Sequence, residues 1–292
     1  MLEWIETFWS TYNTLILSIG INSLLALSIA LTLSCGLLSL ANAAFMGIGA
    51  YAAATLTMKL NCPFELALFL SILAPVCVAL VIGIPTLRLS GVYLAMATLG
   101  FGEVLRVIIM NIEFIGGPMG LNGIPNITSF WHVLLALLAV IYGIWRLKIS
   151  KVGRAFAAIR EDEVAAKLMG IPVMQFKLLA FTLGAGIAGL AGGLNAHFTY
   201  TIGPNSYAFE NAVEILTMAV FGGANSLLGP ILGGTLLTLL PEVLRGLKEY
   251  RLAVNGLVLI LVVLYLPNGL WSGKFRRIKK PMDSNKDNHQ HV

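Results

Sequence analysis

Few residues of this chain are of the kinds that carry out chemistry, and they do not form a catalytic pattern. The sequence has no G-x-x-x-x-G-K-[ST] phosphate loop, no H-E-x-x-H zinc motif and no G-x-S-x-G nucleophile motif. His132 and His197 stand alone, and His289 and His291 lie in the C-terminal tail. We therefore expect a protein that is not an enzyme and that holds no cofactor.

The three cysteines, Cys35, Cys62 and Cys77, are scattered through apolar sequence. They form no C-x-x-C pair and have no histidine at ligand spacing, which argues against a metal site. Cysteine in such surroundings behaves as a small hydrophobic residue. We expect three buried cysteines and no metal.

Two pairs of opposite charge occur in the same tetrapeptide, E-V-L-R, near the outer ends of two predicted membrane spans. They are Glu103 with Arg106 and Glu242 with Arg245, each at the i, i+3 spacing of helix neighbours. A charge in hydrocarbon costs at least about 2.5 kcal/mol, so these groups should pair or reach water. Each pair is predicted to be either a salt bridge at a helix end or part of a polar rim on an outward vestibule.

Four further polar residues are candidates for a path through the membrane. Asn42 and Asn195 lie in predicted spans rich in glycine and alanine, where an amide needs a partner. Glu210 and Glu214 lie one helical turn apart and face either the path or the outer headgroups. The surrounding glycines are interpreted mainly as packing residues, with unwinding around a substrate as the alternative.

Residues 150–175 form a charged stretch between two apolar segments. Its second half predicts a short helix over 161–169, with acids at the N-terminus and Glu163 paired to Lys167. Gly170 is placed for the left-handed position after the helix, and Pro172 stops it. The stretch is either a docking element for a cytoplasmic partner or a solvated loop. Its candidate coupling residues are Arg154, Arg160, Glu161, Asp162, Glu163, Lys167 and Gly170.

The elements that position these residues are predicted to be membrane helices. Hydrophobic residues make up 58% of the 292 residues and charged residues only 11%, against about 25% charged in soluble domains. Several windows of about 20 residues are almost free of charge. We expect an all-α polytopic membrane protein with about nine spans (eight to ten), over 15–33, 36–58, 66–84, 91–110, 130–147, 177–198, 210–221, 230–244 and 252–270.

We expect a single transmembrane domain over residues 1–292. Residues 1–12 combine four aromatic residues with two acids and predict an interfacial segment at the outer face, and they lack the basic residues of a signal peptide. Residues 274–292 predict a basic, disordered cytoplasmic tail. A shift of 139 residues superimposes the two E-V-L-R copies and the second span on the sixth, which suggests a parallel internal repeat.

The distribution of basic residues predicts the orientation. Placing residues 150–175 inside puts fourteen of the nineteen lysines and arginines on the cytoplasmic side, as the positive-inside rule requires. With nine spans the N-terminus is then outside and the C-terminus inside. The net charge of +5 is interpreted as an attraction to anionic lipid rather than to nucleic acid.

The stretch G-R-A-F-A-A-I-R-E-D-E-V-A-A-K-L-M-G-I resembles the coupling segment of ABC transporter permeases, in particular branched-chain amino acid permeases of the LivM type. Similar stretches are Q-F-K-L-L-A-F-T-L-G-A-G-I-A-G-L-A-G and the run from E-I-L-T-M-A-V-F-G-G to L-L-P-E-V-L-R, so the resemblance covers residues 15–273. We call residues 150–175 the coupling segment. The sequence departs from the family at Asn42, where histidine is more usual.

The resemblance implies one permease subunit of a bacterial inner-membrane importer. It would work with a LivH-type permease, two ATPase subunits and a periplasmic binding protein, and would carry branched-chain or other hydrophobic amino acids. Urea or short amides are an alternative substrate class. A secondary transporter or channel, or a membrane scaffold, are the alternatives outside the family.

Overall fold

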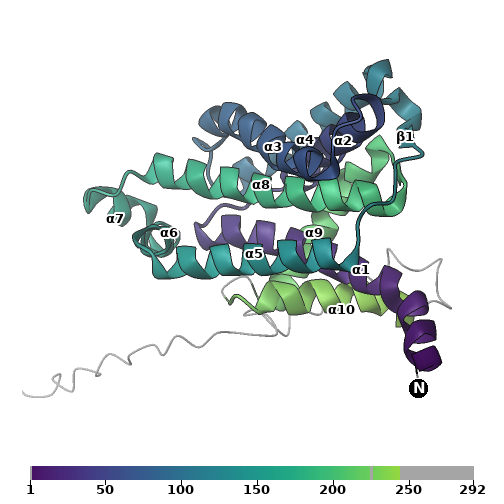
Figure 1. Cartoon of the computed structure of the whole chain (residues 1–292). Helices are drawn as coiled ribbons and strands as arrows, with labels where there is room; N and C mark the ends of the chain where they lie inside the picture. The colour runs from purple at the N-terminus through teal and green to yellow at the C-terminus, as the bar shows by residue number, and fades with distance from the viewer. Residues whose placement is uncertain (1, 224–225, 244–292) are drawn as a thin grey trace, which may run out of the picture.

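The computed structural model describes residues 2–223 and 226–243, with side chains from residue 12 to 223 and from 226 to 240. Within these ranges the chain is almost entirely helical (Figure 1). The helices are α1 (Leu2–Ser34), α2 (Asn42–Lys59), α3 (Phe64–Thr86), α4 (Gly91–Asn111), α5 (Phe130–Ile149), α6 (Lys151–Glu161), α7 (Glu163–Leu168), α8 (Val173–Thr199), α9 (Phe209–Gly222) and α10 (Gly229–Val243).

Short elements connect α4 to α5 and α8 to α9 at one end of the bundle. They are the 3-10 turns η1 (Glu113–Ile115), η2 (Gly117–Met119) and η3 (Pro204–Tyr207) and the strands β1 (Leu121–Asn122) and β2 (Thr201–Ile202). The two strands pair antiparallel, with Leu121 opposite Ile202. We call this the strand end, and the end that carries α6 and α7 the coupling end.

Five of the described helices are long and apolar enough to cross a membrane: Tyr12–Ser34, Phe64–Thr86, Gly91–Asn111, Phe130–Ile149 and Val173–Thr199. This number fits a multi-pass membrane protein. The other described helices are shorter or less apolar, and α9 has only 14 residues. The predicted span over 252–270 and the predicted tail over 274–292 lie outside the described residues, so the count of nine stays a prediction.

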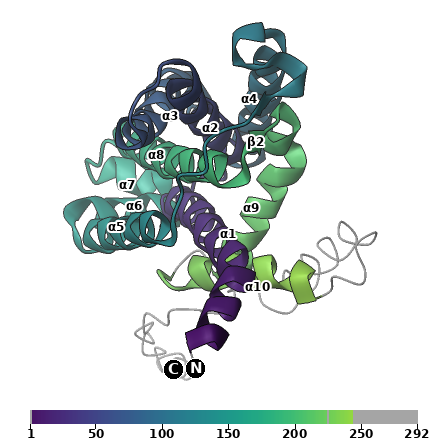
Figure 2. The same cartoon turned by 45° about the vertical axis from the view of Figure 1, so that its right-hand side comes forward.

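The long helix α8 lies at the centre, between α2, α3 and α1 (Figures 1 and 2). Glycines let the backbones meet, because a Cβ on Gly49 of α2 would lie 2.3 Å from the carbonyl oxygen of Gly189 on α8. A Cβ on Gly193 would likewise lie 2.6 Å from Oγ of Ser71 on α3. The interpretation of these glycines as packing residues is confirmed.

Helices α2 and α8 run parallel. Gly49 lies against Gly189, and further along both helices Oγ1 of Thr57 lies 3.0 Å from Nε2 of His197. Parallel orientation is what the predicted repeat requires of these two spans. The repeat as a whole stays a prediction.

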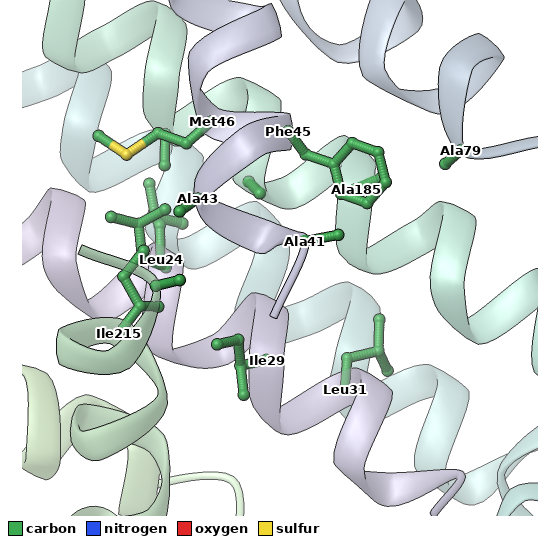
Figure 3. Packing of buried hydrophobic residues seen from close by; sticks show 14 of the residues in the cluster. Leu24, Ile29, Leu31, Ala41, Ala43, Phe45, Met46, Ala79, Ala185 and Ile215 are labelled. Carbon is green, nitrogen blue, oxygen red and sulfur yellow. The ribbon is translucent and has the colours of Figure 1, made fainter. Parts of the chain in front are cut away.

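The apolar core joins α1, α2, α8 and α9 (Figure 3). Leu24 and Ile29 of α1, Phe45 of α2 and Ile215 of α9 are almost fully buried. The rings of Phe45 and Phe181 meet edge to face, with centroids 5.3 Å apart. Outer helices expose large apolar side chains, which suits contact with lipid or another membrane subunit.

Helix boundaries differ from the predictions at two places. Residues 2–12 are the first part of α1 rather than a separate element, and their interfacial position stays a prediction. Helix α2 begins at Asn42 rather than at residue 36. Gly36, with φ of +77°, ends α1 in a Schellman motif, in which Leu37 N–H donates to the Thr32 carbonyl and Gly36 N–H to the Leu33 carbonyl.

The cysteines are also less uniform than expected. Cys35 is buried, Cys62 is half-buried and Cys77 is exposed on α3. An exposed thiol on a membrane helix still faces an apolar surrounding, because this helix surface would contact lipid or a neighbouring subunit.

Candidate functional site

The coupling segment folds as two short helices rather than one. The side chain of Ser150 caps α6 by accepting from the N–H groups of Val152 and Gly153. Asp162 interrupts the helix and caps α7 by accepting from Val164 N–H at 2.8 Å and Ala165 N–H at 3.0 Å. The prediction of one helix over 161–169 is therefore wrong at its start, because Asp162 has extended backbone, with φ of −156° and ψ of 111°.

The end of α7 has the predicted geometry. Gly170 has φ of +81°, its N–H donates to the Lys167 carbonyl, and Ile171 N–H donates to the Ala166 carbonyl. These two bonds form a Schellman motif, and Pro172 follows it. Both ends of α7 are thus fixed by local hydrogen bonds, which makes a six-residue helix a firm element.

An ion pair attaches α7 to the central helix α8. Nζ of Lys177 lies 2.6 Å from Oε2 of Glu163, and the Lys177 side chain is only 7% exposed. The predicted ion pair between Glu163 and Lys167 is therefore wrong, because Glu163 pairs with Lys177 instead. Aromatic packing adds a second attachment, since the rings of Phe156 on α6 and Phe176 on α8 meet at 6.3 Å.

The end of α1 meets the same junction. A Cβ on Gly36 would lie 3.2 Å from Cα of Arg160 on α6, so the α1 turn touches the α6 backbone. Burial raises the pKa of the neighbouring Cys35 thiol to about 12, although the charge of Lys177 partly opposes this. Helices α1, α6, α7 and α8 therefore meet in one junction at the coupling end, in which Cys35 and Lys177 are buried.

The outer surface of α7 combines charge with exposed apolar side chains. Leu168 and Met169 are 83% and 82% exposed, and Val164 is exposed beside them. Apart from Ala166, the described residues 160–170 are all exposed, and so is Arg154. Figure 1 shows α6 and α7 as a short arm at one end of the bundle. Such a surface on a firm helix is suited to docking a partner.

The predicted pair on α4 is formed and connected to a third residue. Arg106 Nε donates to Glu103 Oε2 at 2.8 Å, and Arg106 Nη1 donates to Asn205 Oδ1 at 3.0 Å. Glu103 lies eight residues before Asn111, which ends α4, so it is about 12 Å from that end. This is deeper than the helix-end position that we expected. The side chain of Glu242 and the whole of Arg245 lie outside the described residues.

The four path candidates do not gather at one place. Asn42 is not in mid-helix but is the first residue of α2, where its buried Nδ2 donates to Ser28 Oγ at 2.8 Å. Asn195 is half-buried on α8. Glu210 is exposed in the first turn of α9, and Glu214 is half-buried one turn later. Their role in a path stays a prediction.

Lys177 was not predicted as a site residue and counted only as one of the basic residues on the cytoplasmic side. Its contact with Glu163 joins residues 14 positions apart, and the available signal in the sequence was a lysine at the start of the glycine-rich span predicted over 177–198. Tyr207 was missed as well. It packs against Gly47 and is 4% exposed.

Among the described residues no group of three or more His, Cys, Asp or Glu could hold a metal ion.

Comparison with known proteins decides the family. The family of permease components of branched-chain amino acid transport systems matches residues 11–263. This chain belongs to that family. The described apolar helices agree with a membrane permease, and its relatives are transport components rather than enzymes.

Named relatives include both permease types of one transport system. The chain is 34% identical to the high-affinity branched-chain amino acid permease LivM of Salmonella typhimurium, over 88% of this chain and 67% of the relative. It is 33% identical to LivM of Escherichia coli K12 over the same shares. It is also 35% identical to E. coli K12 LivH, over 48% of this chain and 45% of that protein. No solved structure gives a significant match.

Proposed function

We propose that this chain is one permease subunit of an ATP-driven importer for branched-chain or similar hydrophobic amino acids in the inner membrane of a bacterium. Its partners are a LivH-type permease, two ATPase subunits and a periplasmic binding protein. Family membership supports the transport role, and similarity to both LivM and LivH supports a permease pair.

The observation that carries the ATPase-driven mechanism is the arm formed by α6 and α7. Its exposed residues Leu168 and Met169 offer an apolar contact, and Arg154, Arg160, Glu161, Asp162 and Lys167 surround it with charge. Caps at both ends of α7 and the Glu163–Lys177 pair fix the arm to α8. A subunit that pushes on the arm therefore pushes on the central helix.

The transport cycle follows from this connection. Closure of the ATPase dimer on ATP shifts α6 and α7 as a unit, and the shift reaches α8 through the buried junction. Because α8 packs on α2 and α3 through backbone contacts at glycines, it cannot move without them. ATP binding thus favours one of two packed arrangements, open to opposite sides.

The orientation follows from the same role. The coupling end faces the cytoplasm, where ATP is available, and the strand end faces outward. This places the N-terminus outside, and with nine spans the C-terminus inside, in agreement with the positive-inside count.

The test replaces an exposed apolar residue of the arm by an acid. Met169→Asp should abolish co-purification of the ATPase subunits and reduce uptake of labelled leucine at least about tenfold, because a charge replaces a docking contact. Met119→Asp is the matched control, since Met119 is 87% exposed at the strand end. The control should keep ATPase binding. Equal ATPase binding by both variants would contradict the proposal.

A second substrate class, urea or short amides, is separated by the same preparation, since labelled urea can replace leucine. A channel or ion-coupled transporter is less well supported. It would need an available mid-span carboxylate, whereas Glu103, the described acid that lies deepest in a long span, is paired with Arg106 at 2.8 Å.

A further inference from the structure

A shallow hollow lies between the middle of α4 and the first turns of α2 and α9. Figure 2 shows α4 at the edge of the bundle, on the side of α9. Apolar residues from three elements line the hollow, among them Leu40, Ala44, Leu99 and Phe209. Glu103 lines it too, and Arg106 follows one turn later on the same helix.

The cost of exposing charge to hydrocarbon indicates that lipid does not cover the face of α4 that carries Glu103 and Arg106. The side chains of Glu103 and Arg106 are 36% and 29% exposed, although they lie within a membrane-spanning helix. A charge that faces hydrocarbon is costly, so charged side chains inside spans normally face a bundle interior or a water-filled cavity. The exposed part of this pair is therefore expected to face water or another permease subunit rather than lipid.

The two charges are only partly satisfied. Glu103 accepts from Arg106 through Oε2, while its Oε1 has no hydrogen-bond partner among the described residues. Arg106 uses Nε and Nη1, for Glu103 and Asn205, and its Nη2 has no partner within the same ranges. The hydroxyl of Tyr207, which also lines the hollow, is buried and unpartnered within them. Unused donors and acceptors beside a partly exposed apolar surface are suited to a polar ligand.

We propose that this hollow is the half-site through which the amino acid passes, with its ammonium at Glu103, its carboxylate at Arg106 and its side chain against Leu40, Leu99 and Phe209. A zwitterion with an aliphatic side chain carries these three features. This inference rests on the proposed function and names the residues that meet its substrate. The second permease completes the site from the side that this chain leaves open.

The hollow is too small in this arrangement to enclose an amino acid, so the proposal requires α4 to move away from α2 and α9 during transport. The contact between Arg106 and Asn205 holds α4 to the segment before α9, and a ligand carboxylate would compete for the same guanidinium. A passing site of this kind gives weak affinity. It affects the maximal rate of import rather than the concentration at half-saturation.

The test uses three variants of the full chain in the assembled importer: Glu103→Gln, Arg106→Gln and the exchange Glu103→Arg with Arg106→Glu. Each single variant removes one charged hydrogen bond to the zwitterion and should lower the maximal uptake of labelled leucine about 10- to 100-fold. The exchange keeps a helix ion pair at the same spacing, and Asn205 can donate to the new glutamate. It reverses the charges that the zwitterion meets, so uptake should stay low.

The controls separate this inference from the proposed function. Glu113→Gln, an exposed acid in η1 outside the hollow, should transport as wild type. Restored uptake in the exchanged variant would show a purely structural salt bridge and overturn the inference, and so would single variants that transport normally. Wild-type protein that imports no leucine would instead overturn the proposed function.

A second measurement does not depend on the charges. Gly102→Cys, in a chain whose own cysteines are replaced by alanine, should fold, because the nearest atom to its Cβ is Ala44 Cβ at 3.7 Å. A small thiol reagent should modify it and block leucine uptake while ATPase binding persists. Complete modification with unchanged uptake would overturn the inference.

Discussion

Single glycines decide how closely the central helices approach. Gly49 faces the backbone of α8, and Gly192 of α8 faces the carbonyl of Met46, where a Cβ would lie 2.0 Å away. Neither contact leaves room for a methyl group, so both require backbone movement on substitution. A glycine in a helix is otherwise unfavourable, which is why its presence here needs a packing reason.

Gly49→Ala should therefore destabilise the protein by about 1–3 kcal/mol, as in overpacked cores. Gly143→Ala is the matched control, because no atom lies within 4 Å of the added Cβ on α5. It should be neutral or stabilising by up to about 1 kcal/mol. Thermal unfolding in detergent measures both, and a lower Tm for Gly143→Ala than for Gly49→Ala would contradict this packing.

At the scale of elements, the proposed mechanism depends on the attachment of α7 to α8, through which movement of the arm would reach the central helix. Lys177→Met should release α7 and uncouple ATP hydrolysis from leucine uptake, with a loss of about 1–2 kcal/mol in the coupling contact, since Glu163 is half exposed. The exchange Glu163→Lys with Lys177→Glu should restore uptake, because it rebuilds the pair. Uptake that the exchange leaves as low as in Lys177→Met would refute the attachment.

Local sequence signals predicted local structure well. Gly170 and Pro172 predicted the end of α7, and apolar windows predicted the five long, apolar helices found among the described residues. Asp162 was misplaced, because three consecutive acids, Glu161 to Glu163, leave open at which of them the helix begins, although aspartate is the best N-cap among them. The partner of Glu163 could not be predicted from the sequence. Lys177 lies beyond the turn between α7 and α8, and the geometry of that turn depends on tertiary packing.

The candidate path was the least predictable part. Asn42 was expected in mid-span, but its position depends on where α1 ends and α2 begins. Gly36 ends α1, and a hydrogen bond from the backbone of Leu40 fixes the segment before α2. Leu40 N–H donates to Oγ1 of Thr98 on α4, a contact 58 residues away in the sequence. The depth of Glu103 likewise depends on the end of α4, and its hollow on three separate elements.

At the scale of the whole molecule, the chain has one closely packed end and one partly exposed face that carries the Glu103–Arg106 pair. The coupling end joins four helices in a packed junction beneath the arm, while α4 makes few contacts with the bundle other than at the strand end. This difference between the coupling end and α4 suits a permease in which the coupling end receives force and α4 moves relative to the bundle. The proposed ATPase subunits would exert the force, and the proposed second permease would complete the path.

The central claim, that an ATPase subunit docks on the arm, is tested most directly by a photo-crosslinking residue at position 168 in the assembled membrane. We expect a crosslink to an ATPase subunit from position 168 and none from the similarly exposed position 119 at the strand end. A crosslink from position 168 to lipid alone, or to a protein outside the cell, would contradict it.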